Sequence, residues 1–80
     1  MYIACYKAKN EDGRDYDISY NVIKEENCFM IECYVDGGNE YNISSIGKCT
    51  AFAAENIAKY LAARALRPIH LEDVISDMRL

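Results

Sequence analysis

The sequence predicts an α+β fold in which a three- to four-stranded antiparallel N-terminal sheet has one face covered by two C-terminal helices. Apolar residues alternate with period two through the first half of the chain, and after residue 47 they recur at helical spacing. Turn-forming residues separate the segments at 10–13, 25–27 and 36–39. Because short turns join consecutive strands, the sheet is expected to be antiparallel.

Strands are expected over residues 2–9, 16–24 and 28–35, and the short run 40–46 is a candidate fourth strand. A two-residue turn at Glu26 and Asn27 sets Tyr20 opposite Cys33 and Val22 opposite Ile31. The alternating apolar residues of both strands then fall on one face, and this agreement favours that register. The residues that share this face are Ile18, Tyr20, Val22, Phe29, Ile31, Cys33 and Val35.

The register of the first hairpin depends on where its turn lies. If Asp12 and Gly13 close it, Ile3 pairs with Val22 and Cys5 pairs with Tyr20, so both would face the core. A slip of one residue would invert the faces of the first strand.

The first helix is expected over residues 49–66, since Ala54, Ile57, Ala58, Leu61 and Ala65 form a single apolar stripe. Thr50 is a suitable N-cap, and Glu55 and Lys59 form an i,i+4 pair. Pro68 is expected to end this helix, because the residue before a proline is disfavoured in the α region.

A second helix is expected over residues 70–78, with Leu71, Val74, Ile75 and Met78 on one face. Glu72 and Asp73 fall in its first turn, where the helix dipole favours acidic residues. Ile69 and Val74 have the spacing of a hydrophobic staple around His70.

Size and charge restrict the possible functions. Eighty residues with a net charge of −4 make a single domain, residues 1–80, with little room for a catalytic cavity, so we expect no enzymatic activity. Acidity argues against nucleic acid or an anionic membrane as partner. Residues 1–42 carry nine acidic and four basic residues. This imbalance is typical of a solvated strand face, and the alternative is a preference for basic partners.

The cytoplasm is the expected location. No apolar run reaches the length of roughly 18 residues that a membrane helix needs. Residues 1–9 also lack the basic, apolar and small-residue pattern of a signal peptide. The sequence has no Cys-x-x-Cys spacing among its four cysteines, which are Cys5, Cys28, Cys33 and Cys49. We therefore expect free thiols and neither a metal nor a cofactor.

Two motifs are candidate chemical sites. His70 beside Glu72 and Asp73 could act as a base or a metal ligand, but helix capping is the simpler interpretation, since no nucleophile is identified. Gly37 and Gly38 lack the spacing of a phosphate-binding loop and predict a turn.

Three segments resemble a family. They are Ile23-Lys24-Glu25-Glu26-Asn27, Asn42-Ile43-Ser44, and Pro68-Ile69-His70-Leu71-Glu72-Asp73-Val74-Ile75 with Asp77. Together they are similar to a small clostridial (Firmicutes) domain of unknown function that ends in a Pro-Ile/Val-His-Leu-x-Asp-Val segment. The resemblance spans residues 16–80, with a few extra residues before Pro68. It implies a cytosolic bacterial protein and no activity, cofactor or catalytic residue. It marks Pro68, His70, Leu71 and Asp73 as a motif of unknown role.

The sheet face turned away from the helices is the candidate interaction face. Under the favoured registers it carries Tyr2, Ala4, Tyr6, Ile23, Met30 and Tyr34, which are less polar than a solvated face requires. Phe52 falls on the side of the first helix opposite the apolar stripe. We expect it to pack against a neighbouring segment or to lie in an interface. We therefore expect a small non-enzymatic protein-interaction or regulatory module that forms a homo-oligomer, most simply a homodimer, or binds an unknown protein partner. The alternatives are a single-stranded nucleic-acid-binding module that uses the sheet aromatics, and a metal or enzymatic site at His70.

Overall fold

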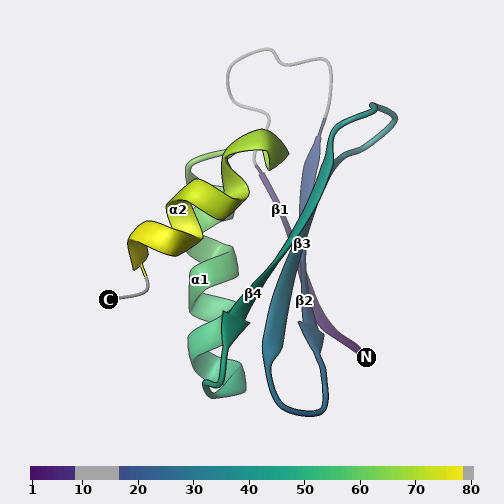
Figure 1. The fold of residues 1–80 in the computed structure, drawn as a ribbon. Coiled ribbons are helices and arrows are strands. Elements are labelled where there is room, and N and C mark those ends of the chain that lie inside the picture. Colours follow the sequence, from purple (N-terminus) through teal and green to yellow (C-terminus); the bar gives the residue numbers. More distant parts are fainter. Residues whose placement is uncertain (9–16, 79–80) are drawn as a thin grey trace.

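The computed structural model describes residues 1–8 and 17–78 and shows the expected α+β fold. A four-stranded sheet precedes two helices (Figure 1). The strands run in the spatial order β1-β2-β3-β4, with every neighbouring pair antiparallel. The candidate fourth strand is therefore present. The elements are β1 Tyr2–Lys7, β2 Ile18–Lys24, β3 Phe29–Val35, β4 Tyr41–Gly47, α1 Ala51–Ala63, the 3₁₀ turn η1 Pro68–His70 and α2 Leu71–Met78.

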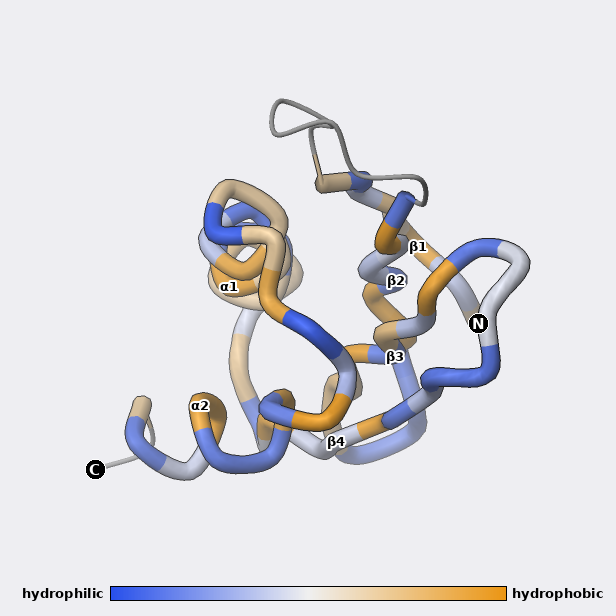
Figure 2. The backbone as a smooth tube through the Cα atoms, turned by 90° about the horizontal axis from the view of Figure 1, so that it is seen from above, coloured by the Kyte–Doolittle hydropathy of each residue, from blue (hydrophilic) through white to orange (hydrophobic). Residues whose placement is uncertain are grey.

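The molecule has two layers, with both helices on the same side of the sheet (Figures 1 and 2). Helix α1 packs mainly on β2, β1 and β3, and α2 packs on β4. The core between the layers is built from the inner strand faces and the helix stripes: Ile18, Tyr20, Val22, Phe29, Ile31, Cys33, Val35, Ala54, Ala58, Leu61, Leu71 and Ile75. Small alanines at 54 and 58 let α1 approach the sheet closely.

The register predicted for β2 and β3 is confirmed. Tyr20 pairs with Cys33 and Val22 pairs with Ile31 across the hairpin. All four side chains are buried. The turn expected at Gly37 is also present, and the φ of +75° at this residue is one that glycine adopts without strain.

The register predicted for β1 is wrong by one residue. Ala4 pairs with Val22 and Tyr6 pairs with Tyr20, because a bulge lies between Tyr2 and Ala4. A bulge inserts one residue into a strand and shifts the faces that follow it. Ile3 still packs against the core, but Cys5 is exposed.

Tyr6 and Ala4 consequently face the helices, and the prediction that they point outward is wrong. The Tyr6 hydroxyl donates a hydrogen bond to Glu55 Oε1 at 2.8 Å, and Lys59 Nζ lies 5.6 Å from the centre of the Tyr6 ring. The hydrogen bond to Glu55 raises the pKa of the Tyr6 phenol. The two residues expected to pair along α1 thus both contact β1.

Helix α1 is shorter than the predicted 49–66. Thr50 is its N-cap, as expected, and accepts a hydrogen bond from the Ala53 N–H at 3.1 Å. At the other end, Leu66 N–H donates to Leu61 O and Ala65 N–H donates to Ala62 O. This is the Schellman pattern, in which Ala65 takes the left-handed position with φ +49°. Helix α1 therefore ends at Ala63, before the position at which Pro68 would terminate it.

Pro68 begins a new turn and does not terminate the preceding helix. It is buried, occupies the first position of η1, and follows an extended Arg67 (φ −77°, ψ 149°). Helix α2 then starts at Leu71, one residue later than predicted, with Glu72 and Asp73 in its first turn. Ile69 is 70% exposed, so the predicted staple between Ile69 and Val74 is wrong.

The turn predicted at 10–13 and the strand residues predicted at 9 and 16 lie outside the described residues.

Candidate functional site

The outer face of the sheet, which points away from both helices, is formed by alternate residues of the four strands. In the described part of the chain, no helix covers it (Figures 1 and 2). Strand pairing sets Tyr2 beside Ile23, Ile23 beside Met30, and Tyr34 beside Tyr41. Glu32 lies between Asn21 and Ile43 on this face. The outer face is thus a band of large side chains around one acidic residue.

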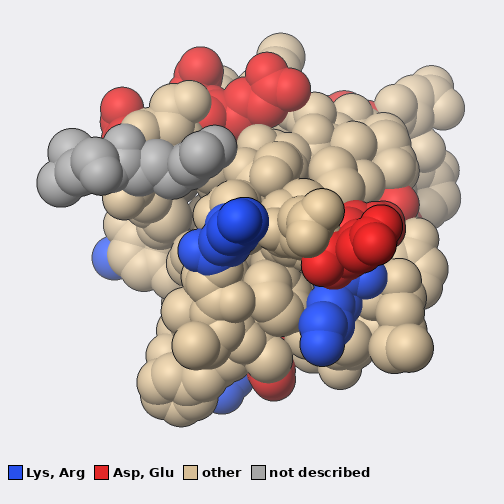
Figure 3. Space-filling view, turned by 60° about the horizontal axis from the view of Figure 1, so that its bottom comes forward, with Lys and Arg blue, Asp and Glu red and all other residues tan. Residues whose placement is uncertain are grey.

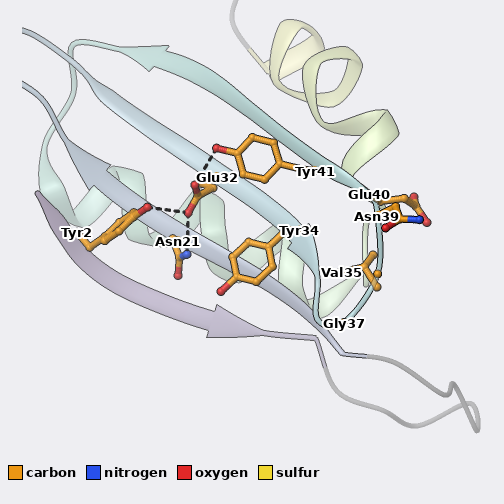
Figure 4. Close-up of a pocket in the computed structure, with 10 residues that line it drawn as sticks. Tyr2, Asn21, Glu32, Tyr34, Val35, Gly37, Asn39, Glu40 and Tyr41 are labelled. Atoms are coloured by element: carbon orange, nitrogen blue, oxygen red, sulfur yellow. Dashed lines mark hydrogen bonds between the residues drawn. The ribbon is translucent and has the colours of Figure 1, made fainter.

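Glu32 is held by three hydrogen bonds from three different strands. Its Oε1 accepts from the Tyr2 hydroxyl at 3.1 Å and from Asn21 Nδ2 at 3.0 Å. Its Oε2 accepts from the Tyr41 hydroxyl at 2.8 Å. Figure 4 shows the rings of Tyr2 and Tyr41 on opposite sides of this carboxylate. The three donors fix the side chain in one position.

The Glu32 carboxylate is ionised at neutral pH although it is only 9% exposed. Burial by itself would raise the pKa of this carboxyl group, but the hydrogen bonds from Asn21, Tyr41 and Tyr2 outweigh it and hold the pKa below its usual value. Within residues 1–8 and 17–78, no lysine, arginine or histidine side chain forms an ion pair with Glu32. Its charge is therefore stabilised by neutral donors.

Tyr2 and Tyr41 remain 62% and 58% exposed although their hydroxyls are fixed. The hydrogen bond to Glu32 raises the pKa of each phenol, so both keep their protons and stay donors at neutral pH. Their rings are therefore exposed to solvent but restrained in orientation.

An open cleft of about 540 Å³ lies beside these tyrosines. We call it the tyrosine cleft; Tyr2, Asn21, Glu32, Tyr34, Tyr41 and residues 35 and 37–40 line it (Figure 4). A second carboxylate of the lining, Glu40, is paired with Arg67, and this hydrogen bond lowers its pKa. Glu32 is thus the carboxylate of the cleft that lacks a cation among the described residues.

Only some of the residues expected on the interaction face lie on the outer face of the sheet. Tyr2, Ile23, Met30 and Tyr34 lie on the outer face, as predicted. Ile23 is buried there by its neighbours, and Met30 and Tyr34 are half-buried. Tyr6 belongs to the helix side. Phe52 is 75% exposed on α1, so it is directed away from the core as predicted, but α1 lies on the other side of the sheet from the cleft.

Glu32, Asn21 and Tyr41 are central to the cleft but are not among the site residues predicted from the sequence. The strand pattern indicates only ordinary solvated residues at Glu32 and Asn21, and it assigns no face to Tyr41. A signal is present, because a lone acidic residue alternates with Met30 and Tyr34 on a face rich in tyrosine. Only the pairing of four strands brings the three donors to one carboxylate.

The C-terminal motif has structural contacts. Leu71 is fully buried, Pro68 is buried, and the Pro68 carbonyl accepts a hydrogen bond from Asn42 Nδ2 at 3.0 Å. Asp73 is exposed in the first turn of α2. His70 is exposed at the end of η1, and its backbone N–H donates to Arg67 O. The motif therefore docks α2 onto β4.

The described residues include no group of three or more His, Cys, Asp or Glu side chains that could hold a metal ion. All four cysteines are free thiols. Neither α1 nor α2, the two α-helices within residues 1–8 and 17–78, is both long and apolar enough to cross a bilayer.

Comparison with protein-family models, with curated proteins and with solved structures found no match to this chain.

Proposed function

We propose that this chain is a non-enzymatic protein-interaction module that binds through the outer face of its sheet. The observation that carries the proposal is the pair of exposed tyrosines whose hydroxyls are anchored on Glu32. Tyrosine contributes large contact area at interfaces, and a ring that is already oriented loses less conformational entropy on binding. Solvated strand faces do not need such anchoring.

A second copy of the chain is the first partner to test, because a small domain with an apolar outer face gains stability from association. The cytoplasm is the proposed location, and the four free thiols are in keeping with a reducing compartment. The resemblance of the Pro68–Val74 segment to the clostridial family supports a bacterial origin as part of the same proposal.

Single-stranded nucleic acid is a weaker candidate for this face. Exposed aromatic rings on a sheet can stack bases, but the ionised Glu32 carboxylate between them would repel phosphates. At the end of the molecule that carries the β2–β3 turn, acidic and basic side chains are interspersed and form no large basic area (Figure 3). The ionised Glu32 in the cleft therefore favours a protein partner over a nucleic acid.

The test compares wild-type protein with Tyr2→Ser/Tyr41→Ser in sedimentation equilibrium over a dilution series. Self-association through the outer face predicts a dimer that this double variant weakens. The matched control is Tyr60→Ser, which removes a 41%-exposed tyrosine from α1 and should leave association unchanged.

If the wild-type protein is a monomer, the same three proteins are used as baits in an extract of cells that express the chain. A partner that wild-type and Tyr60→Ser both retain, and the double variant loses, supports the proposal. A strict monomer that retains no partner in a Tyr2- and Tyr41-dependent manner overturns it.

A further inference from the structure

The buried charge of Glu32 has no counter-charge within residues 1–8 and 17–78. Acidic side chains that are nine-tenths buried are normally paired with a cation, because an isolated charge is costly to remove from water. The two ion pairs of the described residues, Lys7–Asp36 and Arg67–Glu40, leave Glu32 out. Three neutral donors hold its position but leave one full negative charge at the base of the tyrosine cleft.

The geometry of the carboxylate restricts the kind of cation it can accept. A carboxylate offers about four lone-pair positions, two on each oxygen. Both positions on Oε1 are taken by Tyr2 and Asn21, and one on Oε2 is taken by Tyr41. The single remaining position suits one N–H of an ammonium group. A bidentate guanidinium would need a free position on each oxygen.

The walls of the cleft suit the rest of a lysine side chain. Figure 4 shows the rings of Tyr34 and Tyr41 nearly face-on in a view onto the outer face, so their π faces point outward. A cation is attracted to such a face, and the four-carbon stem of lysine packs along apolar rings. The acidic excess of residues 1–42 also favours the approach of a basic segment.

We propose that the tyrosine cleft binds the ammonium group of a lysine side chain that a basic segment of the partner protein presents. The lysine donates to the open position of Glu32 Oε2 and lies against the tyrosine rings. This inference rests on the proposed function, since it names the chemistry of the partner for the same face. A symmetric contact between two copies would have to keep their Glu32 carboxylates apart, because two negative charges brought together repel each other.

The experiment titrates ¹⁵N-labelled full-length protein with an acetylated and amidated peptide of four lysines, and follows the amide shifts by NMR. Shifts should be confined to residues of the cleft, such as Tyr2, Asn21 and Tyr41, and should be absent from α1. A peptide of four acetyl-lysines, which lacks the charge, should produce none. The corresponding arginine peptide should bind more weakly, because only one acceptor position is open.

Glu32→Gln removes the charge and should lower the affinity for the lysine peptide about tenfold. This is the loss expected for one charge-assisted hydrogen bond. The matched control is Glu55→Gln, which makes the same change of net charge at a carboxylate that also accepts from a tyrosine, but on the helix side. This control should bind within about twofold of wild type, since a charge on the far side of the sheet is screened by solvent and contributes little to binding at the cleft.

Equal weakening by both variants would show that the peptide responds only to net charge, and would overturn the proposal. So would shifts spread over the whole surface, or equal binding of the arginine and lysine peptides. If Glu32→Gln fails to fold, the wild-type shift map and the arginine peptide still test the proposal. If the lysine peptide causes no shifts in the cleft but association still depends on Tyr2 and Tyr41, only this inference fails. If association is also unchanged in Tyr2→Ser/Tyr41→Ser, the proposed function fails as well.

Discussion

The hydroxyl of Tyr20 donates a hydrogen bond to the carbonyl oxygen of Leu66 at 2.6 Å, which joins a central strand to the segment that follows α1. Tyr20 is fully buried, and the Cys33 thiol approaches the same carbonyl at 3.8 Å. The Leu66 carbonyl lies beyond the helical ladder, so it needs a partner from elsewhere in the fold. A residue that alternation alone places in the core thus also fixes the path of the chain between the helices.

Tyr20→Phe should lower the free energy of unfolding by about 1–2 kcal/mol, because the Leu66 carbonyl loses its strong donor inside the core. Urea denaturation measures the change. Tyr60→Phe is the control, because it removes a hydroxyl from a partly exposed ring and should change stability by less than about 0.5 kcal/mol. Equal losses in the two variants would contradict a role for the Leu66 contact.

Ala65→Gly should raise the melting temperature. Ala65 has φ +49° at the end of α1, a conformation that costs an L-residue about 1–2 kcal/mol and glycine almost nothing. Part of this gain is lost with the Ala65 methyl group, which packs against the core. Ala63→Gly, at the last helical residue of α1, should instead destabilise, by at most about 1 kcal/mol. If Ala65→Gly and Ala63→Gly lower the melting temperature by the same amount, a Schellman end at Ala65 is excluded.

Stability should fall as the pH drops below about 4, the ordinary range of carboxyl groups. Three hydrogen bonds overcome the effect of burial and lower the pKa of Glu32, and hydrogen bonds from Lys7 and Ser19 lower that of Asp36. Because both folded pKa values lie below the unfolded ones, their stabilisation is present above the unfolded pKa and is lost as the pH falls through the folded pKa.

Urea denaturation of wild type at a series of pH values from 7 to about 2 follows this loss. Glu32→Gln and Asp36→Asn should each show a shallower fall in stability than wild type. An unchanged acid dependence in both variants would assign the loss to other carboxyl groups.

Cys33 should be the slowest thiol to react with iodoacetamide in the folded protein. Burial, with a smaller contribution from the charge of Glu40, raises its pKa to about 12, so almost none is thiolate at pH 8. Cys5 is exposed on the outer face and should be modified first. Mass spectrometry of timed digests measures the order, and modification of Cys33 as fast as Cys5 would contradict the described burial.

Local pattern is sufficient for much of the fold. The alternation in residues 18–24 and 29–35 predicts the β2–β3 register correctly, because a two-residue turn and two apolar faces permit a single solution. The helical stripe through Ala54, Ala58 and Leu61 likewise identifies the buried side of α1. The end of that helix is predicted wrongly, because Pro68 is a visible stop signal whereas the left-handed Ala65 has none in the sequence.

The first strand shows why prediction of the candidate site is less complete. A bulge between Tyr2 and Ala4 reverses the faces of Tyr6 and Cys5, since one inserted residue shifts every side chain that follows it. Tyr2 keeps its outward position because it precedes the bulge. The groups that donate hydrogen bonds to Glu32 are not predicted, because they come from three strands. The alternation within one strand does not indicate which residues are its neighbours across the sheet.

The amino-acid pattern alone predicts the α+β class, the order of strands and helices, most of the inner core residues and the presence of tyrosines on an outer face. These features depend on period and composition, which are local properties of the chain. The convergence of Tyr2, Asn21 and Tyr41 on Glu32 is visible only in the folded protein. The same holds for the lack of an ion pair to this carboxylate among the described residues. Strand register explains this difference, because hydrogen bonds between residues up to 30 positions apart form only once the strands are aligned.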